Sequence, residues 1–361
     1  MLTLFIICTS LLVLATALPL SRQDHWIFRS MDFPRFQLLI FAVILTVVMI
    51  AFLDLRSTAT IILLGLTGLC LFWQLWWILP YTPLLPIEVK RSHDQSPNRK
   101  LSILTSNVLT SNRNAAALID LVKEHEPELL VTLESDQWWQ EQLAELEAEM
   151  PHTIKCPLDN RYGMHLYSRL PLHDGEICFL VEDDVPSIHV AVELRSGDRV
   201  RAHFLHPAPP SPTENEESAE RDAELIIVAR SVADSDQPVI VAGDLNDVAW
   251  SSTTRLFRKI SGLLDPRIGR GMFNTFHAGY PLMRWPLDHL FHSHHFTLRS
   301  IKRLPSIGSD HFPLFTSLSF TPTQKNQQEG PTAEREDRQR ATEIANEKEV
   351  SKAAVPKPNA G

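Results

Sequence analysis

Cysteine is scarce in this chain, with four residues in 361. Cys8 and Cys70 lie in long apolar stretches, so only Cys156 and Cys178 remain for a soluble part. Two cysteines cannot show whether they are bridged, so cysteine usage does not indicate on which side of a membrane that part lies.

Positive charge is also scarce. Residues 101–320 contain 19 Lys and Arg against 31 Asp and Glu, a net charge of −12. A protein that binds DNA without sequence preference normally presents a basic face. The acidic balance argues against that class, although it is compatible with a small phosphorylated substrate.

Charged side chains are absent from three stretches, residues 1–20, 36–53 and 58–80. Each is close to the ~20 residues that a membrane-spanning helix needs. The third stretch contains Trp73, Trp76 and Trp77 near its end and is followed by Tyr81. Such amphipathic aromatic side chains are enriched at the level of the lipid headgroups. We predict three transmembrane helices within a membrane region of residues 1–82.

The orientation of this region stays open. Basic residues are concentrated in the first connection and after the third helix, which by the positive-inside rule places the soluble part in the cytoplasm. Ala15-Thr16-Ala17 resembles a signal cleavage site, and cleavage there would place the soluble part outside. No Lys or Arg precedes this stretch, which favours an uncleaved helix. We predict a multi-pass protein of the plasma (inner) membrane.

Composition divides the rest of the chain into three parts. Residues 83–100 are polar and contain prolines, which predicts a linker. Residues 101–320 are long enough to bury packed layers around a core. Residues 321–361 are charged and nearly free of large apolar groups, so we expect a disordered tail. Within it, residues 333–354 could instead fold as a helix on a partner.

Polar side chains follow a strongly predicted strand near the middle of the soluble part. The apolar run 239–242 indicates a buried strand that stops at Gly243-Asp244-Leu245-Asn246. Asp244 and Asn246 are two apart, so an extended chain would direct both to one side. A carboxylate beside an amide suits holding a nucleophilic water against a phosphate, while the motif alone also suits a turn.

Further segments have the same character. Residues 101–107, 128–134 and 199–206 each read as a strand that ends on a polar residue, and two later segments carry Asp-His motifs. The residues at these positions are Asn107, Glu134, His206, Asp288, Asp310 and His311. Singly, each suits a cap, a turn or an incidental position; together they favour a functional site.

These residues, with the motifs GDLN, LDH and GSDHFP, resemble the endonuclease/exonuclease/phosphatase superfamily in order and in strand-end context over residues 101–320. The resemblance implies an α/β fold, a four-layer α/β sandwich of two mixed sheets with helices outside. It also extends to a membrane-tethered subgroup with three N-terminal helices that includes the teicoplanin-resistance membrane proteins. That subgroup implies an isoprenyl diphosphate phosphatase facing outward.

The superfamily resemblance implies a Mg²⁺ or Mn²⁺ cofactor. It makes Glu134 the principal ligand, with Asn107 and Asp310 nearby in the metal shell. Hard cations of this kind take oxygen ligands. Some nuclease members carry an acidic residue two positions after the first Asn, where this chain has Leu109. We therefore do not expect two metal ligands from that strand.

The same resemblance implies roles for five further residues. Asp244 and Asn246 would orient the attacking water and a phosphate oxygen. His311, polarised by Asp288, would contact the scissile phosphate. His206 would stabilise the transition state or assist the leaving group.

The sequence thus predicts a membrane-anchored, Mg²⁺-dependent phosphoesterase that hydrolyses a phosphate ester or diphosphate by in-line attack of water. A soluble part close to the bilayer favours a lipid-linked substrate, with the lipid bilayer as a partner. A membrane-tethered nuclease is the first alternative, less favoured because the domain is acidic. A catalytically silent membrane scaffold is the second, and it needs none of these residue types at strand ends.

Overall fold

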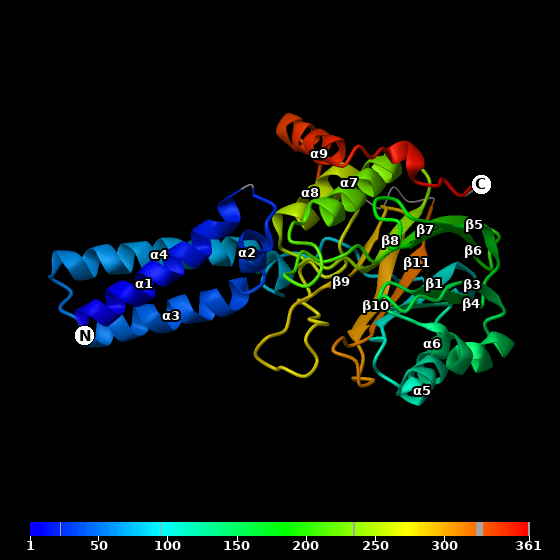
Figure 1. Cartoon of the computed structure of the whole chain (residues 1–361), viewed down its shortest axis with the longest axis horizontal. Coiled ribbons are helices and arrows are strands. Elements are labelled where there is room, and N and C mark those ends of the chain that lie inside the picture. Colours follow the sequence, from blue (N-terminus) through cyan, green and yellow to red (C-terminus); the bar gives the residue numbers. More distant parts are fainter. Residues whose placement is uncertain (22, 95, 234, 323–327, 360–361) are drawn as a thin grey trace.

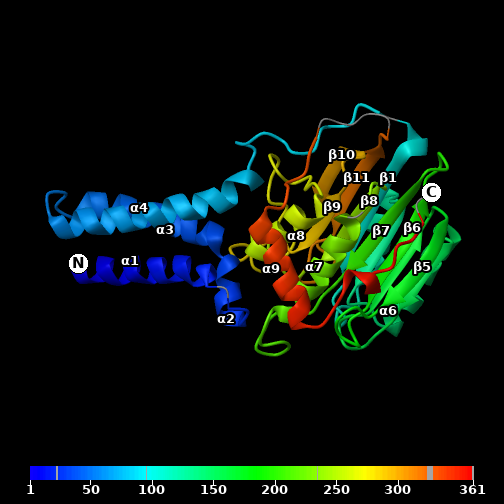
Figure 2. The ribbon, with the colours of Figure 1, turned by 90° about the horizontal axis from the view of Figure 1, so that it is seen from above.

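A bundle of apolar helices and a β-sandwich follow one another along the long axis of the molecule (Figures 1 and 2). The computed structural model describes residues 1–361 except 22, 95, 234, 323–327 and 360–361. Short 3₁₀ helices lie in the connections: η1 (Leu18–Leu20), η2 (Ser30–Asp32), η3 (Leu79–Tyr81), η4 (Pro97–Arg99), η5 (Leu143–Ala148) and η6 (Lys352–Ala354).

Three helices of the bundle are long and apolar enough to cross a membrane, as predicted. They are α1 (Leu2–Ala17) continued by η1, α3 (Arg35–Phe52), and α4 (Thr58–Ile78) continued by η3. The short α2 (Trp26–Arg29) lies between α1 and α3. Polar groups inside the bundle pair with one another. Gln74 Nε2 donates to Thr16 Oγ1 at 3.0 Å, and Arg35 Nη1 donates to Gln74 Oε1 at 3.2 Å. These bonds offset the cost of burying polar groups between apolar helices.

The sandwich contains two mixed sheets. The first has the order β10-β11-β1-β2-β4-β3 and the second the order β5-β6-β7-β8-β9. The strands of the first are β1 (Lys100–Asn107), β2 (Leu129–Leu133), β3 (His152–Cys156), β4 (Met164–Ser168), β10 (Phe296–Arg303) and β11 (Leu314–Phe320). Those of the second are β5 (Leu172–Cys178), β6 (Ser187–Glu193), β7 (Arg199–Leu205), β8 (Val239–Asp244) and β9 (Asp288–His292).

Helices cover the outer face of each sheet. α5 (Ala115–His125) and α6 (Gln137–Gln142) pack on the first sheet, whereas α7 (Ala219–Ala233) and α8 (Ser252–Ser261) pack on the second (Figure 1). Central strands are therefore covered on both faces, which explains their continuous apolar runs. Every residue of β2 and β8 is buried. The predicted four-layer α/β sandwich is confirmed.

The segment predicted as a linker is fixed along the sandwich. Val89 is buried in the core between the sheets, and Ser92 N donates to Leu298 O at 2.7 Å. Glu88 forms an ion pair with Arg258 of α8. These contacts hold the segment against the sandwich, so it is not the free polar spacer that its composition suggested.

The C-terminal tail also differs from the expectation of disorder. Residues 335–347 form α9 (Arg335–Glu347), which packs across α7 and α8 (Figure 2). Ala341, Ile344 and Ala345 are its buried residues. Their i, i+3 and i+4 spacing makes one apolar stripe, and a capping box stabilises the start of the helix. Three small or medium apolar residues change the average composition of this charged segment very little, so composition predicted disorder where a helix packs.

Candidate active site

The residues predicted for the site gather at neighbouring strand ends of the two sheets. β1 and β2 are parallel, as are β7 and β8, so the carboxyl ends of each pair share one edge. β9 is antiparallel to β8, and its first residue Asp288 pairs with Asp244. The positions are Asn107 ending β1, Glu134 after β2, His206 after β7, Asp244 ending β8, Asn246 two residues later, Asp288 starting β9, and Asp310 with His311 between β10 and β11.

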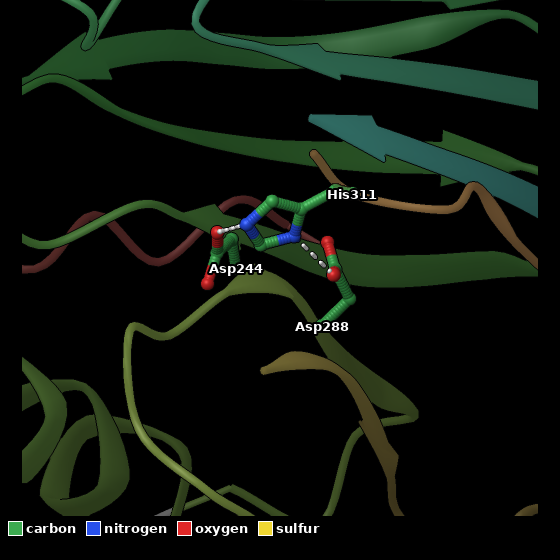
Figure 3. A group of neighbouring side chains, drawn as sticks. All are labelled: Asp244, Asp288 and His311. Carbon is green, nitrogen blue, oxygen red and sulfur yellow. Dashed lines mark hydrogen bonds and ion pairs between the residues drawn. The ribbon is translucent and has the colours of Figure 1, made fainter. Parts of the chain in front are cut away.

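His311 lies between two carboxylates (Figure 3). Its Nδ1 is 2.8 Å from Asp288 Oδ2 and its Nε2 is 3.4 Å from Asp244 Oδ2. Burial lowers the pKa of His311, but the charges of Asp244 and Asp288 outweigh burial and raise the pKa to about 10. The ring is therefore an imidazolium at neutral pH, with an N–H directed at each carboxylate.

His206 also lies near Asp244, yet its pKa is shifted in the opposite direction. Its Nε2 is 4.0 Å from Asp244 Oδ2, and its ring packs against Tyr162 with a centroid distance of 5.4 Å. Its Nδ1 has no hydrogen-bond partner among the residues that the structure describes. Burial dominates here and lowers the pKa of His206 to about 4, so this ring is neutral.

Asn107 connects the two sheets. Its Nδ2 donates to Glu134 Oε1 at 2.8 Å and to Asp244 Oδ2 at 3.3 Å. Its Oδ1 accepts from Leu109 N at 3.1 Å. Asn107 therefore presents its amide nitrogen to the site, and the predicted metal contact through Oδ1 would require the amide to turn over.

Glu134 has one carboxylate oxygen without a hydrogen-bond partner within the described part of the chain. This oxygen, Oε2, is buried. Burial raises the pKa of Glu134 to about 7, although the bond from Asn107 opposes this. The partly exposed Asp310 raises it further. An orphaned buried carboxylate beside a second acid fits a divalent cation, which takes oxygen ligands.

A second group of possible metal ligands consists of Asp244, Asp288 and His311, whose candidate atoms all lie within 4.8 Å of one another. A histidine that binds a metal must present an unprotonated nitrogen. Both nitrogens of His311 already face carboxylates, and its raised pKa opposes loss of a proton. Glu134 with Asp310 is the better match for a cation.

The chain turns directly after Asp244. Leu245 enters the core, while Asn246 adopts a φ of 50° and remains beside the site. Its Nδ2 donates to Pro207 O at 3.0 Å, and its carbonyl accepts from Arg221 Nη1 at 2.8 Å. The chain thus turns at Asn246, and Asp244 and Asn246 both line the same cavity. Glu134 has a similar φ of 55°, and such left-handed conformations in non-glycine residues are often found at functional sites.

A cavity of about 510 Å³ contains the site. Glu134, Asp244, Asn246, Asp310 and His311 form its polar wall. Its apolar wall comes from the connection before α3 and from the chain before β9, through residues Phe33, Pro34, Phe276, Met283, Trp285 and Leu287. Sequence reasoning missed this wall, because no local pattern places residues 33–34 beside a strand end more than 200 positions later.

Ion pairs connect the bundle to the site. Arg29 of α2 lies 3.6 Å from Asp222 of α7, whose neighbour Arg221 donates to the Asn246 carbonyl. Arg221 also donates to Asp222 Oδ1 at 2.8 Å. All three charged side chains are buried. The helical region therefore contacts the elements that position Asn246.

Comparisons with known proteins agree with this geometry. The family model "Endonuclease/Exonuclease/phosphatase family" matches residues 104–311. A search of curated protein sequences finds no match. The resemblance to teicoplanin-resistance membrane proteins is not addressed by these comparisons and stays a prediction.

Three solved structures illustrate the shared fold. An endonuclease/exonuclease/phosphatase from Beutenbergia cavernae is 17% identical, with a TM-score of 0.51 over 62% of this chain and 72% of that one. TDP2 from D. rerio, complexed with a single-strand DNA product, is 17% identical, with a TM-score of 0.50 over 61% and 99%. The human Nocturnin catalytic domain is 16% identical, with a TM-score of 0.50 over 62% and 96%. The chain belongs to the endonuclease/exonuclease/phosphatase family, whose members are metal-dependent phosphoesterases or nucleases.

Proposed function

We propose that the protein is a membrane-anchored, Mg²⁺-dependent phosphoesterase that hydrolyses a phosphate ester or diphosphate by in-line attack of water. One observation carries this proposal. His311, which lies between two carboxylates that favour its cationic form, and Glu134, whose Oε2 is buried without a hydrogen-bond partner in the described part of the chain, line the same cavity. A phosphate needs positive donors around its oxygens, and a divalent cation needs an uncompensated acid to hold it.

Glu134 would hold the cation with Asp310 and, after its amide turns, Asn107. When bound, the cation neutralises charge on the phosphate oxygens. His311 would turn its Nε2–H, which faces Asp244 Oδ2 at 3.4 Å, to the scissile phosphate, while Asp288 at 2.8 Å from Nδ1 keeps the ring oriented. This arrangement is preorganised, because both carboxylates around His311 are buried in the absence of substrate.

Asp244 would accept the proton of the attacking water. Burial raises its pKa above the ordinary value, while the neighbouring His311 opposes that rise. Asn246 lies beside it, with its backbone N donating to Asp244 Oδ1 at 2.9 Å. The neutral His206, whose Nε2 is 4.0 Å from Asp244 Oδ2, would donate a hydrogen bond to the leaving oxygen without adding charge.

A lipid-linked phosphate suits the cavity best. One wall is polar and acidic, while the other is built from Phe33, Met283 and Trp285, among other apolar residues. Phe33 and its neighbours belong to the connection that enters α3, a helix apolar enough to cross a membrane. A substrate with a charged head and a hydrocarbon chain would match both walls.

The test is phosphate release by the full chain in lipid vesicles, with Mg²⁺ or with EDTA. Polyprenyl diphosphate, a phospholipid phosphate and plasmid DNA would be supplied in parallel. We expect metal-dependent release from a lipid-linked phosphate that the His311→Ala variant loses. Turnover of DNA alone would replace the proposal with a tethered nuclease, and equal turnover in EDTA would contradict the metal requirement.

A further inference from the structure

The segment between α8 and β9 forms a projecting loop, residues 277–284, which we call the interfacial loop. It lies on the side of the sandwich that faces the helical bundle, where Figure 1 shows it in yellow below β9. Its tip exposes Tyr280, Leu282 and Met283 by 61%, 86% and 54%. In the described part of residues 101–320, the other exposed large apolar side chains are Ile177 and Phe179. Within residues 101–320, exposed apolar surface is thus concentrated on this loop, and the segment after α4 also exposes Leu84, Leu85 and Ile87.

A hydrogen bond fixes the level of the tip relative to the bundle. Gln37 Nε2, in the first turn of α3, donates to Leu282 O at 3.0 Å. α3 has 18 residues, which at about 1.5 Å per residue gives roughly 27 Å. A hydrocarbon core is about 30 Å thick, so α3 must use its whole length to cross it. Its first turn, and with it Leu282, would then lie at the membrane–water interface.

The loop is held in shape by its own contacts. His277 N donates to Met283 O at 3.1 Å, and Met283 N donates to Tyr280 O at 3.0 Å. Arg284 Nη2 donates to Ala278 O at 3.0 Å. A preformed loop presents its apolar side chains without the entropy cost of ordering them on binding.

The base of the loop contacts the active site. Ala278 N donates to Asp310 O at 2.6 Å, and the Phe276 ring packs against His311 with a centroid distance of 4.9 Å. Met283 lines the cavity. The same short segment therefore joins the apolar tip to the residues proposed to bind phosphate.

We propose that the interfacial loop inserts Tyr280, Leu282 and Met283 into the headgroup region of the lipid leaflet where α3 begins. The loop would act as a second membrane contact beside the helices and hold the opening of the cavity at the bilayer surface. A lipid-linked phosphate could then reach His311 while its hydrocarbon chain stays in the bilayer. The inference that the loop inserts into the leaflet is drawn from the contacts of the loop. The inference about substrate access also depends on the proposed function.

Insertion can be measured without any activity assay. The full chain, with Cys8, Cys70, Cys156 and Cys178 replaced by Ala, would carry Leu282→Cys labelled with an environment-sensitive fluorophore in phosphatidylcholine vesicles. We expect quenching by nitroxides attached to the lipids and protection from aqueous iodide. The control is Glu124→Cys on α5, an exposed position remote from the bundle, which should respond to iodide alone. A Leu282 probe that behaves like the control would overturn the proposal. Protection from both quenchers would also overturn it, because it would indicate cover by protein.

A paired kinetic test examines the consequence for substrate access. Tyr280 and Leu282 do not line the cavity, so the Tyr280→Ser/Leu282→Ser variant should hydrolyse a water-soluble phosphate ester at a rate within about twofold of the parent. Its kcat/KM on a lipid-linked phosphate in vesicles should fall about tenfold, since two apolar anchors are lost. If the variant matched the parent protein on the lipid-linked phosphate as well as on the soluble ester, the role in substrate access would be contradicted. Absence of turnover by the parent protein would refute the proposed function and leave the fluorescence result standing.

Discussion

The two sheets contribute different chemistry to one cavity. The first sheet brings Asn107 and Glu134, and the Glu134 carboxylate accepts a hydrogen bond from the Asn107 amide, while its second oxygen has no partner in the described part of the chain. The second brings Asp244 and Asp288, and His311, which comes from the connection between β10 and β11 of the first sheet, lies between these two carboxylates. We therefore expect the Glu134 half of the site to bind a cation from solution, whereas the carboxylates of the second sheet face a side chain that the first sheet supplies. The two halves differ in whether their carboxylates have a cationic side chain as a partner, and not in the number of carboxylates.

The two histidines extend this comparison. His311 and His206 are 4% and 2% exposed, and both lie near Asp244 Oδ2. Their pKa values nevertheless move in opposite directions, to about 10 and about 4. Three differences act together: Asp244 is closer to His311 than to His206, Asp288 forms a hydrogen bond with His311 and none with His206, and the charge of His311 lowers the pKa of His206. Neighbouring charges therefore set the two pKa values apart where burial is nearly equal.

The largest expected effect follows removal of the cationic donor. His311→Ala should lower kcat/KM on the best phosphate substrate by about 10³-fold, because a fixed charged donor to the transition state is lost. Circular dichroism and thermal unfolding would show that the variant remains folded. His125→Ala, at the end of α5, is the matched control and should retain parental activity. Parental activity in His311→Ala would place the reaction elsewhere.

The next effect concerns the half that we expect to hold the cation. Glu134→Gln keeps the shape and the bond network but removes the charge, so kcat should fall about 10²-fold. The Mg²⁺ concentration that gives half-maximal activity should rise, and calorimetric titration should show weaker Mg²⁺ binding. Asp288→Asn should leave Mg²⁺ binding nearly unchanged. If Asp288→Asn abolished binding while Glu134→Gln did not, the cation would lie on the second sheet instead.

The smallest effect is on stability, and its sign separates the two histidines. A raised pKa gives His311 a stabilising contribution that is complete below about pH 6.5 and is lost as the pH rises toward 10. A lowered pKa makes His206 costly as the pH falls from about 6.5 toward 4, since the unfolded chain then binds the proton more readily.

Urea unfolding in EDTA across this pH range would test the pair. The stability deficit of His311→Gln relative to the parent should shrink above neutral pH. His206→Gln should gain stability relative to the parent below pH 6.5. Parallel curves for the two variants would contradict the assigned protonation states.

Sequence patterns predicted the positions of the site residues because strand ends are local features. Apolar runs that stop at Asn107, Glu134 and Asp244 are visible in the chain itself, and parallel strands bring such ends to one edge. The protonation of His311 could not be predicted in this way, because it depends on carboxylates 67 and 23 positions away.

Other features depend on packing between remote segments. Phe33 lines the cavity four residues after Arg29, which pairs with Asp222 of α7. The apolar stripe of α9 packs against apolar side chains of α7 and α8, which include Ile226 and Leu256. Local propensity gives no information on such partners, so composition alone suggested a solvated tail.

One measurement tests the central claim that water attacks phosphorus at this cavity. The full chain would turn over a lipid-linked phosphate once in ¹⁸O-enriched water with Mg²⁺, and the products would be analysed by mass spectrometry. We expect the ¹⁸O label in the released phosphate, formed about 10³-fold more slowly by His311→Ala and not formed in EDTA. Label in the alcohol product, or turnover that survives both controls, would contradict the account.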